Sequence, residues 1–176
     1  MSTRKTLHAA DIAAAFTRLA DSIARRHQDT SGLVLLGIAN GGIPVCRRLA
    51  ALLAPLLAHP VHQGTLDITF HRDDLGRHPI PKDVARTEIP AEIDRATIIL
   101  VDDVLFSGRT ARAALEEVFS LGRPDRVELA VLIDRGNRRL PIAPDHTGAH
   151  EPTPPGERVR VRLDPDDSSA DIVTIG

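Results

Sequence analysis

The residues best suited to chemistry are concentrated in the segment Ile98–Thr110. There an apolar stretch, Thr97–Val101, is followed directly by two carboxylates, Asp102 and Asp103. Adjacent carboxylates repel each other unless a cation or hydrogen-bond donors lie between them. The vicinal hydroxyl groups of a ribose, alone or with Mg²⁺, would satisfy both side chains. We therefore interpret Asp102 and Asp103 as sugar-binding residues and as the candidate protein ligands of a substrate-bound Mg²⁺.

The acidic pair is followed by residues that suit a phosphate group. Ser107, Gly108, Arg109 and Thr110 open a segment with helical periodicity. Backbone N–H groups at a helix N-terminus attract anions, and a glycine lets the anion approach closely. Together with the acidic pair, these residues predict a pocket for a phosphorylated ribose, such as phosphoribosyl pyrophosphate. In the alternative interpretation, the two aspartates are ordinary turn residues and Ser107 only caps the helix.

Alternating strands and helices have to position these residues. Apolar residues at helical spacing predict helices, and continuous apolar runs predict strands that are buried on both faces. The predicted order is helix His8 to about His27, strand Leu33–Ile38, helix Ile43 to about Leu57, strand Gly64–Phe70, strand Thr97–Val101, helix Ser107–Leu121 and strand Val127–Ile133. This alternation predicts an α/β fold with a central, mostly parallel sheet flanked by helices. Ligands bind such sheets at the carboxyl ends of the strands.

Other segments complete the predicted organisation. Asn40-Gly41-Gly42 forms a glycine-rich turn between the first predicted strand and its helix. The polar segment from about 71 to 90 is too long for a simple connector, and loops of this length are often functional. The later part of the chain is rich in proline and ends in two predicted short strands, Arg158–Leu163 and Ile172–Ile175. No repeat or domain boundary is evident, so we expect residues 1–176 to form one domain.

The composition argues against several classes of protein. No apolar run approaches the roughly 20 residues of a membrane span, and the first residues lack the apolar core of a signal peptide. The single cysteine, Cys46, cannot form an internal disulfide, which agrees with a reducing cytoplasm. A net charge of −2 and the lack of Trp and Tyr argue against nucleic-acid binding by overall charge or base stacking. The eight histidines are scattered, and none stands in a metal-ligand pattern.

Three further stretches add a resemblance to a known family. They are Leu66–Leu75, Leu121–Pro124 and Val131–Ile142. With the segment that contains the acidic pair, they resemble the PyrR family, a branch of the type I phosphoribosyltransferases. Its members are bifunctional regulators of pyrimidine-operon attenuation with uracil phosphoribosyltransferase activity. The resemblance runs from the first predicted helix almost to the last residue.

The resemblance implies a fold and a reaction. The fold is that of type I phosphoribosyltransferases, with a flexible loop at about 71–90 and a small hood formed partly by residues from about 140 to 176. In the reaction, uracil and phosphoribosyl pyrophosphate give UMP and pyrophosphate, with Mg²⁺ as the cofactor. Asp102 and Asp103 then hold the ribose hydroxyl groups, and Ser107–Thr110 binds the 5-phosphate.

The resemblance also assigns the remaining substrate contacts. Asn40-Gly41-Gly42 stands where the family usually has Thr-Arg-Gly, the turn that binds pyrophosphate. The arginine of that turn is therefore absent, and loss of one charge-assisted contact to pyrophosphate costs roughly 1.5–3 kcal/mol. Arg72 is the candidate catalytic residue that compensates if the loop at about 71–90 closes over the site. Asp134 and Arg135 match the segment that faces the pyrimidine. In the alternative interpretations, the glycine turn is only a flexible helix entry and Arg135 forms a salt bridge at the strand end.

The family binds the leader mRNA of pyrimidine genes when UMP is present. The candidate RNA contacts in this chain are Arg18, Arg25, Arg138 and Arg139, and the alternating residues Arg158, Arg160 and Arg162 share one face of a predicted strand. Such arginines contact phosphates, but a solvated strand face has the same pattern. Four positions that are often basic or histidine in the family are neutral here: Asn137, Ala143, Ala149 and Pro155. RNA binding is therefore expected from the resemblance and not from the residues themselves.

Two alternatives to a catalytic regulator stay open. One is a nucleotide-sensing RNA regulator whose altered pyrophosphate turn no longer supports turnover. The other is a phosphoribosyltransferase for a different base, because the base pocket is the least evident part of the sequence. The resemblance further implies a cytoplasmic homodimer or homotetramer without a membrane segment. Its expected partners are phosphoribosyl pyrophosphate, uracil, UMP and a leader mRNA.

Overall fold

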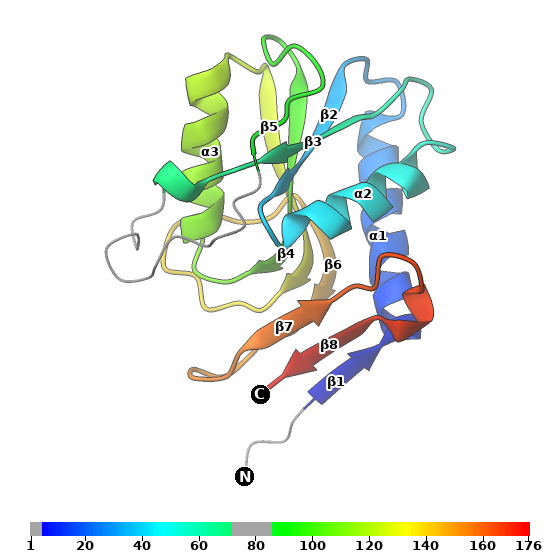
Figure 1. Ribbon diagram of the computed structural model, residues 1–176, viewed down its shortest axis with the longest axis vertical. Coiled ribbons are helices and arrows are strands. Elements are labelled where there is room, and N and C mark those ends of the chain that lie inside the picture. Colours follow the sequence, from blue (N-terminus) through cyan, green and yellow to red (C-terminus); the bar gives the residue numbers. More distant parts are fainter. Residues whose placement is uncertain (1–4, 72–85) are drawn as a thin grey trace.

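A parallel five-stranded sheet forms the centre of the protein (Figure 1). The computed structural model describes residues 5–71 and 86–176. The sheet contains β2 (Leu33–Ile38), β3 (His62–Leu66), β4 (Thr97–Leu105), β5 (Arg126–Asp134) and β6 (His146–His150) in the order β3-β2-β4-β5-β6, with every neighbouring pair parallel. Arg72 and most of the predicted loop at 71–90 lie outside the described residues.

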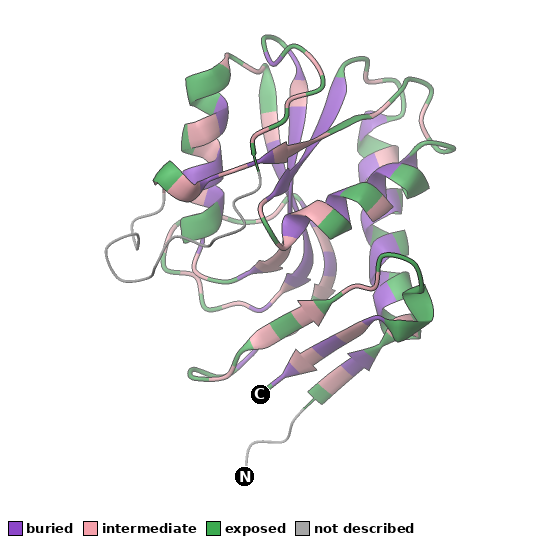
Figure 2. Ribbon diagram, in the orientation of Figure 1, coloured by how far each residue is buried: buried purple, intermediate pink, exposed green. Residues whose placement is uncertain are grey.

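Helices cover both faces of this sheet, as the buried bands in Figure 2 show. Apolar residues on one face pack against α1 (Ala9–His27) and α2 (Gly42–Leu53), and those on the other face pack against α3 (Arg109–Leu121). In β4, Ile99 and Val101 belong to the first core, while Ile98 and Leu100 belong to the second. Because successive side chains point to opposite faces, a strand with two cores must be apolar throughout. The predicted α/β fold is therefore confirmed.

A second, antiparallel sheet of three strands has the order β1-β8-β7. It contains β1 (Lys5–His8), β7 (Val159–Arg162) and β8 (Ile172–Ile175), with a short 3-10 helix, η2 (Ser168–Ala170), before β8. The segment from about 140 to 176, predicted as part of a hood, thus contributes β7 and β8 to this sheet and β6 to the main sheet. The strand β1 was not predicted, since pairing with a distant strand creates it.

Local chemistry explains two boundaries that differ from the prediction. The strand predicted at Gly64–Phe70 ends at Leu66, because the Asp67 carboxylate accepts hydrogen bonds from the backbone N–H and hydroxyl of Thr69 at 2.9 and 2.6 Å. A short 3-10 helix, η1 (Thr69–His71), follows. The helix predicted to reach Leu57 ends at Leu53, because Pro55 has no N–H to continue it.

The second sheet is joined to α2 by one buried carboxylate. Arg48 donates hydrogen bonds to Asp171 and, at 3.0 Å, to the backbone oxygen of Asp164. The Asp171 side chain is only 2% exposed and also accepts from the Asp164 N–H at 2.9 Å. The Arg48 guanidinium lies 5.1 Å from the centre of the Phe16 ring. The Arg48–Asp171 ion pair therefore joins α2 to the segment that leads into β8, and the Arg48 guanidinium also packs on Phe16 of α1.

Asp171→Ala is expected to lower the free energy of unfolding by about 3 kcal/mol, because it leaves the Arg48 guanidinium without its buried partner. Asp166→Ala is the matched control, since Asp166 is an exposed carboxylate in the same segment. The control should change stability by less than about 0.5 kcal/mol. Chemical denaturation of both variants measures the difference, and equal stabilities would contradict this role of Asp171.

Candidate functional site

The acidic pair lies inside β4 and not after its end. The prediction that the strand ends at Val101 was wrong, because β4 and β5 stay paired as far as Leu105 and Asp134. The neighbour on the other side, β2, pairs with β4 only as far as Gly37 with Val101. Asp102 and Asp103 therefore lie just beyond the last paired residue of β2, where one side of β4 is no longer covered by a strand.

The glycine-rich turn after β2 lies directly against this part of β4. A Cβ atom at Gly42 would lie 2.1 Å from the Val101 carbonyl oxygen, and one at Gly41 would lie 2.5 Å from a carboxylate oxygen of Asp103. Gly41 has ordinary helical torsion angles (φ −63°, ψ −33°). Close approach to β4, and not a special backbone conformation, therefore requires glycine at this position. The structure thus brings Asn40-Gly41-Gly42 and the acidic pair together, as expected for one ligand site.

The two carboxylates differ in their surroundings. Asp102 is 8% exposed, and its Oδ1 accepts the Asp103 N–H at 2.9 Å. The Asp103 Oδ1 accepts the Val104 N–H at 2.8 Å. Burial, together with the adjacent negative charge of Asp103, holds the pKa of Asp102 well above its usual range. A cation or hydroxyl donors placed at the pair would reduce this repulsion.

The turn from β4 into α3 contains the residues predicted to bind phosphate, here called the phosphate loop. Gly108 has a positive φ of 92°, a conformation that favours glycine, and it precedes the first residue of α3. The helix begins at Arg109 and not at Ser107 as predicted, because the left-handed Gly108 interrupts the helical backbone. Ser107 Oγ accepts the Arg109 N–H at 3.4 Å. The N–H groups of Thr110 and Ala111, which follow, have no acceptors within the helix, so an anion can accept from them.

A stacked pair of side chains lies beside this loop. Arg135 follows β5, and its guanidinium carbon lies 4.2 Å from the centre of the Phe106 ring. The backbone N–H of Arg135 donates to the Leu105 backbone oxygen at 3.1 Å, and its backbone carbonyl accepts the Thr153 N–H at 3.1 Å. Arg135 is 6% exposed, and its Nε is buried without a hydrogen-bond partner. Among the described residues no carboxylate lies within salt-bridge distance of Arg135, although the charge of the nearby Glu157 opposes the effect of burial, which lowers the pKa of Arg135.

An open cavity of about 510 Å³ lies next to this stacked pair. Phe106 and Arg135 form one side, and the turn Pro155–Arg158 before β7 forms another. Sequence reasoning missed the contribution of this turn, because it lies far along the chain from the acidic pair. The sequence did not predict the cavity either. One of its lining residues, Phe106, directly precedes the phosphate loop.

Comparisons with known proteins agree with this arrangement. Residues 4–157 match the model of the phosphoribosyl transferase domain. The chain is 48% identical over 174 residues to "Bifunctional protein PyrR" of Streptomyces coelicolor, covering 98% of this chain and 89% of the relative. It is 47% identical over 176 residues to the protein of the same name from a Roseiflexus species, covering 99% and 96%.

The chain belongs to the PyrR family. The predicted family is thereby confirmed. A solved hypoxanthine phosphoribosyl transferase of Trypanosoma cruzi has the same fold, with a TM-score of 0.71 and 21% identity over 98% of this chain and 91% of that chain. A second structure of that enzyme gives a TM-score of 0.67 and 20% identity over 95% and 93%. In the described part of this PyrR-family chain, no helix combines the length and apolar character that a membrane span needs.

The Asp134 side chain, predicted to contact the base, has partners within the protein. Its Oδ1 accepts the Gly136 N–H at 2.9 Å and lies 2.6 Å from Nη2 of Arg138. Burial alone would raise the pKa of Asp134, but hydrogen bonds from Arg138 and Gly136 outweigh burial and lower it. Arg138 also donates to the backbone oxygens of Phe106 and Ile142 at 2.9 and 3.1 Å. These contacts favour a structural role for the Asp134–Arg138 pair beneath the cavity.

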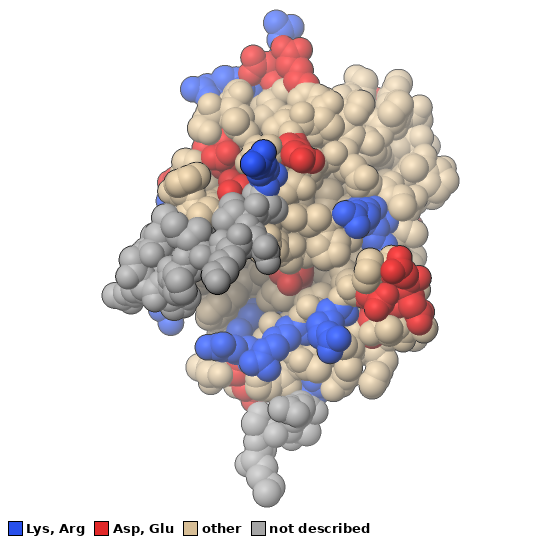
Figure 3. Space-filling view, in the orientation of Figure 1, with Lys and Arg blue, Asp and Glu red and all other residues tan. Residues whose placement is uncertain are grey.

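The predicted RNA contacts differ in how available they are. Arg138 is held by the contacts above, and Arg18 donates to the Gly148 oxygen at 2.6 Å. Arg25 and Arg139 are exposed. Figure 3 shows a row of basic side chains over β7, where Arg158, Arg160 and Arg162 are exposed. RNA contact by any of these residues stays a prediction.

Gly41→Ala is expected to weaken binding of phosphoribosyl pyrophosphate roughly tenfold to a hundredfold, because its new methyl group displaces the Asp103 carboxylate from the site. Pro44→Ala, at an exposed position in the first turn of α2, is the matched control. Isothermal titration with Mg²⁺ present measures both affinities. Unchanged affinity in a folded Gly41→Ala protein would show that the turn and the acidic pair do not share this ligand.

Proposed function

We propose that the chain is a uracil phosphoribosyltransferase, which converts uracil and phosphoribosyl pyrophosphate to UMP and pyrophosphate. The observation that carries this proposal is the contact between the glycine turn and Asp103, next to the loop Ser107–Thr110. The turn can hold pyrophosphate, the acidic pair the ribose and the loop the 5-phosphate. These three groups of residues match the three parts of one substrate. Members of the PyrR family with this domain support the assignment.

In this mechanism the protein stabilises charge that develops at the anomeric carbon. As the bond to pyrophosphate breaks, the ribose gains oxocarbenium character, and a nearby carboxylate from Asp102 or Asp103 stabilises the positive charge. Backbone N–H groups of Ser107–Thr110 hold the 5-phosphate and so fix the sugar in position. The uracil N1 then bonds to the anomeric carbon, and its proton passes to the departing pyrophosphate or to water.

The donor groups of the acidic pair fit a magnesium ion. Carboxylate oxygens are the hard ligands that Mg²⁺ takes in proteins, usually together with substrate oxygens and water. Each carboxylate accepts one backbone N–H, at its Oδ1. Bound Mg²⁺ would neutralise the charge on the pyrophosphate leaving group. Asp102 and Asp103 are the residues that would hold it, directly or through the ribose hydroxyl groups.

The base is assigned to the cavity beside Arg135. The pyrimidine ring of the substrate is placed in this cavity, where the Arg135 guanidinium can pair with its polar edge. The Nε of Arg135 is buried without a hydrogen-bond partner, so a uracil oxygen could accept from it only after the side chain moves. Turnover with each base separates this proposal from a transferase for another base. Purified protein with Mg²⁺ and phosphoribosyl pyrophosphate should form UMP from uracil faster than a nucleotide from any other base.

Asp103→Asn should weaken binding of phosphoribosyl pyrophosphate by at least about tenfold, since the amide no longer provides the negative charge that the ribose and Mg²⁺ require. The fold should persist, because Asp103 is only partly buried. Asp125→Asn, an exposed residue before β5, is the control. Titration calorimetry gives the affinity and circular dichroism the fold. If activity and affinity are unchanged in Asp103→Asn, the assignment of the acidic pair is wrong.

A second function, UMP-dependent binding of a pyrimidine-gene leader mRNA, rests on the name "bifunctional" of the relatives and on the arginine row of β7. We expect a gel shift with the leader RNA at low salt that strengthens with UMP and weakens as salt rises. UMP binding without turnover would favour the non-catalytic regulator. No UMP-responsive shift would remove the regulatory function and leave the enzyme. A cytoplasmic homodimer or homotetramer is part of the same proposal.

A further inference from the structure

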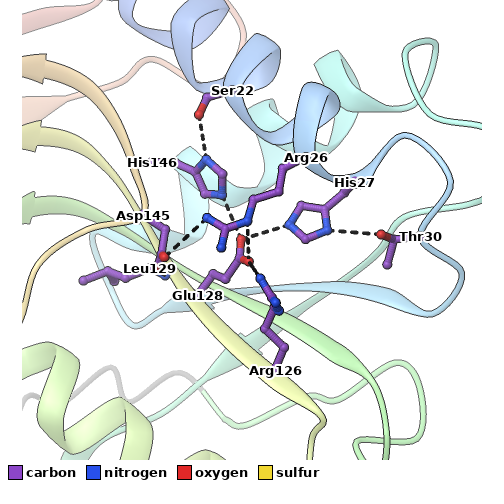
Figure 4. Close-up of polar contacts among 9 residues, drawn as sticks. All are labelled: Ser22, Arg26, His27, Thr30, Arg126, Glu128, Leu129, Asp145 and His146. Atoms are coloured by element: carbon purple, nitrogen blue, oxygen red, sulfur yellow. Dashed lines mark hydrogen bonds and ion pairs between the residues drawn. The ribbon is translucent and has the colours of Figure 1, made fainter.

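A buried cluster of titratable side chains lies where β5 and β6 begin, at the opposite end of the strands from the candidate site. Glu128 is the third residue of β5, His146 is the first residue of β6 and His27 is the last residue of α1. The three residues are 2%, 2% and 4% exposed. Figure 4 shows both imidazole rings directed at the same carboxylate. Two of the histidines that are scattered in the sequence, His27 and His146, thus meet in the fold.

The two oxygens of Glu128 have different partners. The Nε2 atoms of His27 and His146 each lie 2.9 Å from Oε2. Oε1 instead accepts a hydrogen bond from Arg126 Nη1 at 3.1 Å and forms an ion pair with Arg26 Nε at 3.0 Å. The two imidazole nitrogens and one carboxylate oxygen lie within 4.8 Å of one another. The arginines therefore fix the carboxylate through one oxygen and leave the other to the imidazoles.

Each imidazole has a hydroxyl partner at its other nitrogen. His146 Nδ1 lies 2.8 Å from Ser22 Oγ, and His27 Nδ1 lies 3.2 Å from Thr30 Oγ1 (Figure 4). A hydroxyl group rotates to act as donor or acceptor. Each ring can therefore carry its proton on Nδ1, which stays hydrogen-bonded to the hydroxyl group, and leave Nε2 to another partner. With the proton there, both Nε2 lone pairs face the same space as Oε2.

The charges around the cluster also permit a cation. Burial alone would raise the pKa of Glu128, but hydrogen bonds from His27, His146 and Arg126 lower it to about 2, so the carboxylate is ionised at neutral pH. The Arg26 and Arg126 side chains are 43% and 52% exposed, so water can solvate them when a cation adds charge. Asp145 lies 3.6 Å from Arg26 and provides a further negative charge.

We propose that His27, Glu128 and His146 form a site for a divalent transition metal ion of the zinc class, with water as the fourth ligand. Two imidazole nitrogens and one carboxylate oxygen are a common zinc-ligand set. Hydroxyl groups at both Nδ1 atoms supply the outer hydrogen bonds that orient metal-bound imidazoles. The ion replaces the two hydrogen bonds to Oε2, and each ring shifts its proton from Nε2 to Nδ1 without net release. Its role is to join the end of α1 to the beginnings of β5 and β6.

Zinc titration of protein freed of metal by chelation tests this site. With excess Mg²⁺ present and a chromophoric chelator in competition, the protein should bind one equivalent of Zn²⁺ per chain and melt at a higher temperature. His146→Gln should bind Zn²⁺ at least about 100-fold more weakly, because one ligand is lost. His59→Gln, at an exposed position after α2, should bind like the parent protein. Uracil phosphoribosyltransferase activity is measured separately, so failure of either proposal is distinguishable.

Cobalt substitution provides a test that does not depend on a folded variant. Co²⁺ added to the metal-free parent protein should give the intense visible absorption of a four-coordinate nitrogen and oxygen site, and Zn²⁺ should remove it. His27→Gln should give weak absorption only. Lack of stoichiometric binding, equal binding by the parent and His146→Gln, or absence of the cobalt bands would each overturn the proposal. The cluster would then be a hydrogen-bonded network alone.

Discussion

The close contact between the glycine turn and β4 is the constraint on which the candidate site depends. Strand β2 stops pairing with β4 at Val101, and the chain then turns into α2 directly above the uncovered backbone. Any side chain at Gly42 would collide with the Val101 carbonyl oxygen. Since this backbone atom is held in a paired strand, it cannot move away. The position of the turn relative to the acidic pair is therefore fixed by two backbones in contact.

Parallel pairing explains why separate parts of the chain meet at this edge. Every strand of the main sheet ends at the same side, so the segments after β2, β4 and β5 gather there. The backbone oxygen of Ser107 accepts the backbone N–H groups of Arg139 and Leu140, both at 3.0 Å. These bonds link the phosphate loop to the segment after β5. The cavity beside Arg135 lies between that segment and the turn before β7. The proposed positions of sugar, phosphate and ring thus follow from one topology.

The sequence was most informative where apolar runs and glycines coincide. The strands around Leu33–Ile38 and Val127–Ile133, and the turn at Asn40-Gly41-Gly42, could be predicted because burial on both faces and close backbone approach restrict the residue types. The strands β1 and β6 could not, since the short sequences of Lys5–His8 and His146–His150 have no apolar run or clear alternation. The stacking of Phe106 on Arg135 could not be predicted either. Glu128 was a signal in the sequence that the prediction missed. A carboxylate inside the apolar run of β5 requires buried partners, and this could have indicated the histidine cluster.

The structure of a complex with UMP and Mg²⁺ tests the central claim most directly. We expect the 5-phosphate to accept hydrogen bonds from the backbone N–H groups of Ser107–Thr110 and the ribose hydroxyl groups to contact Asp102 and Asp103. The pyrimidine ring should lie in the cavity beside Arg135. A nucleotide bound elsewhere, or one whose ribose makes no contact with either aspartate, would contradict the account.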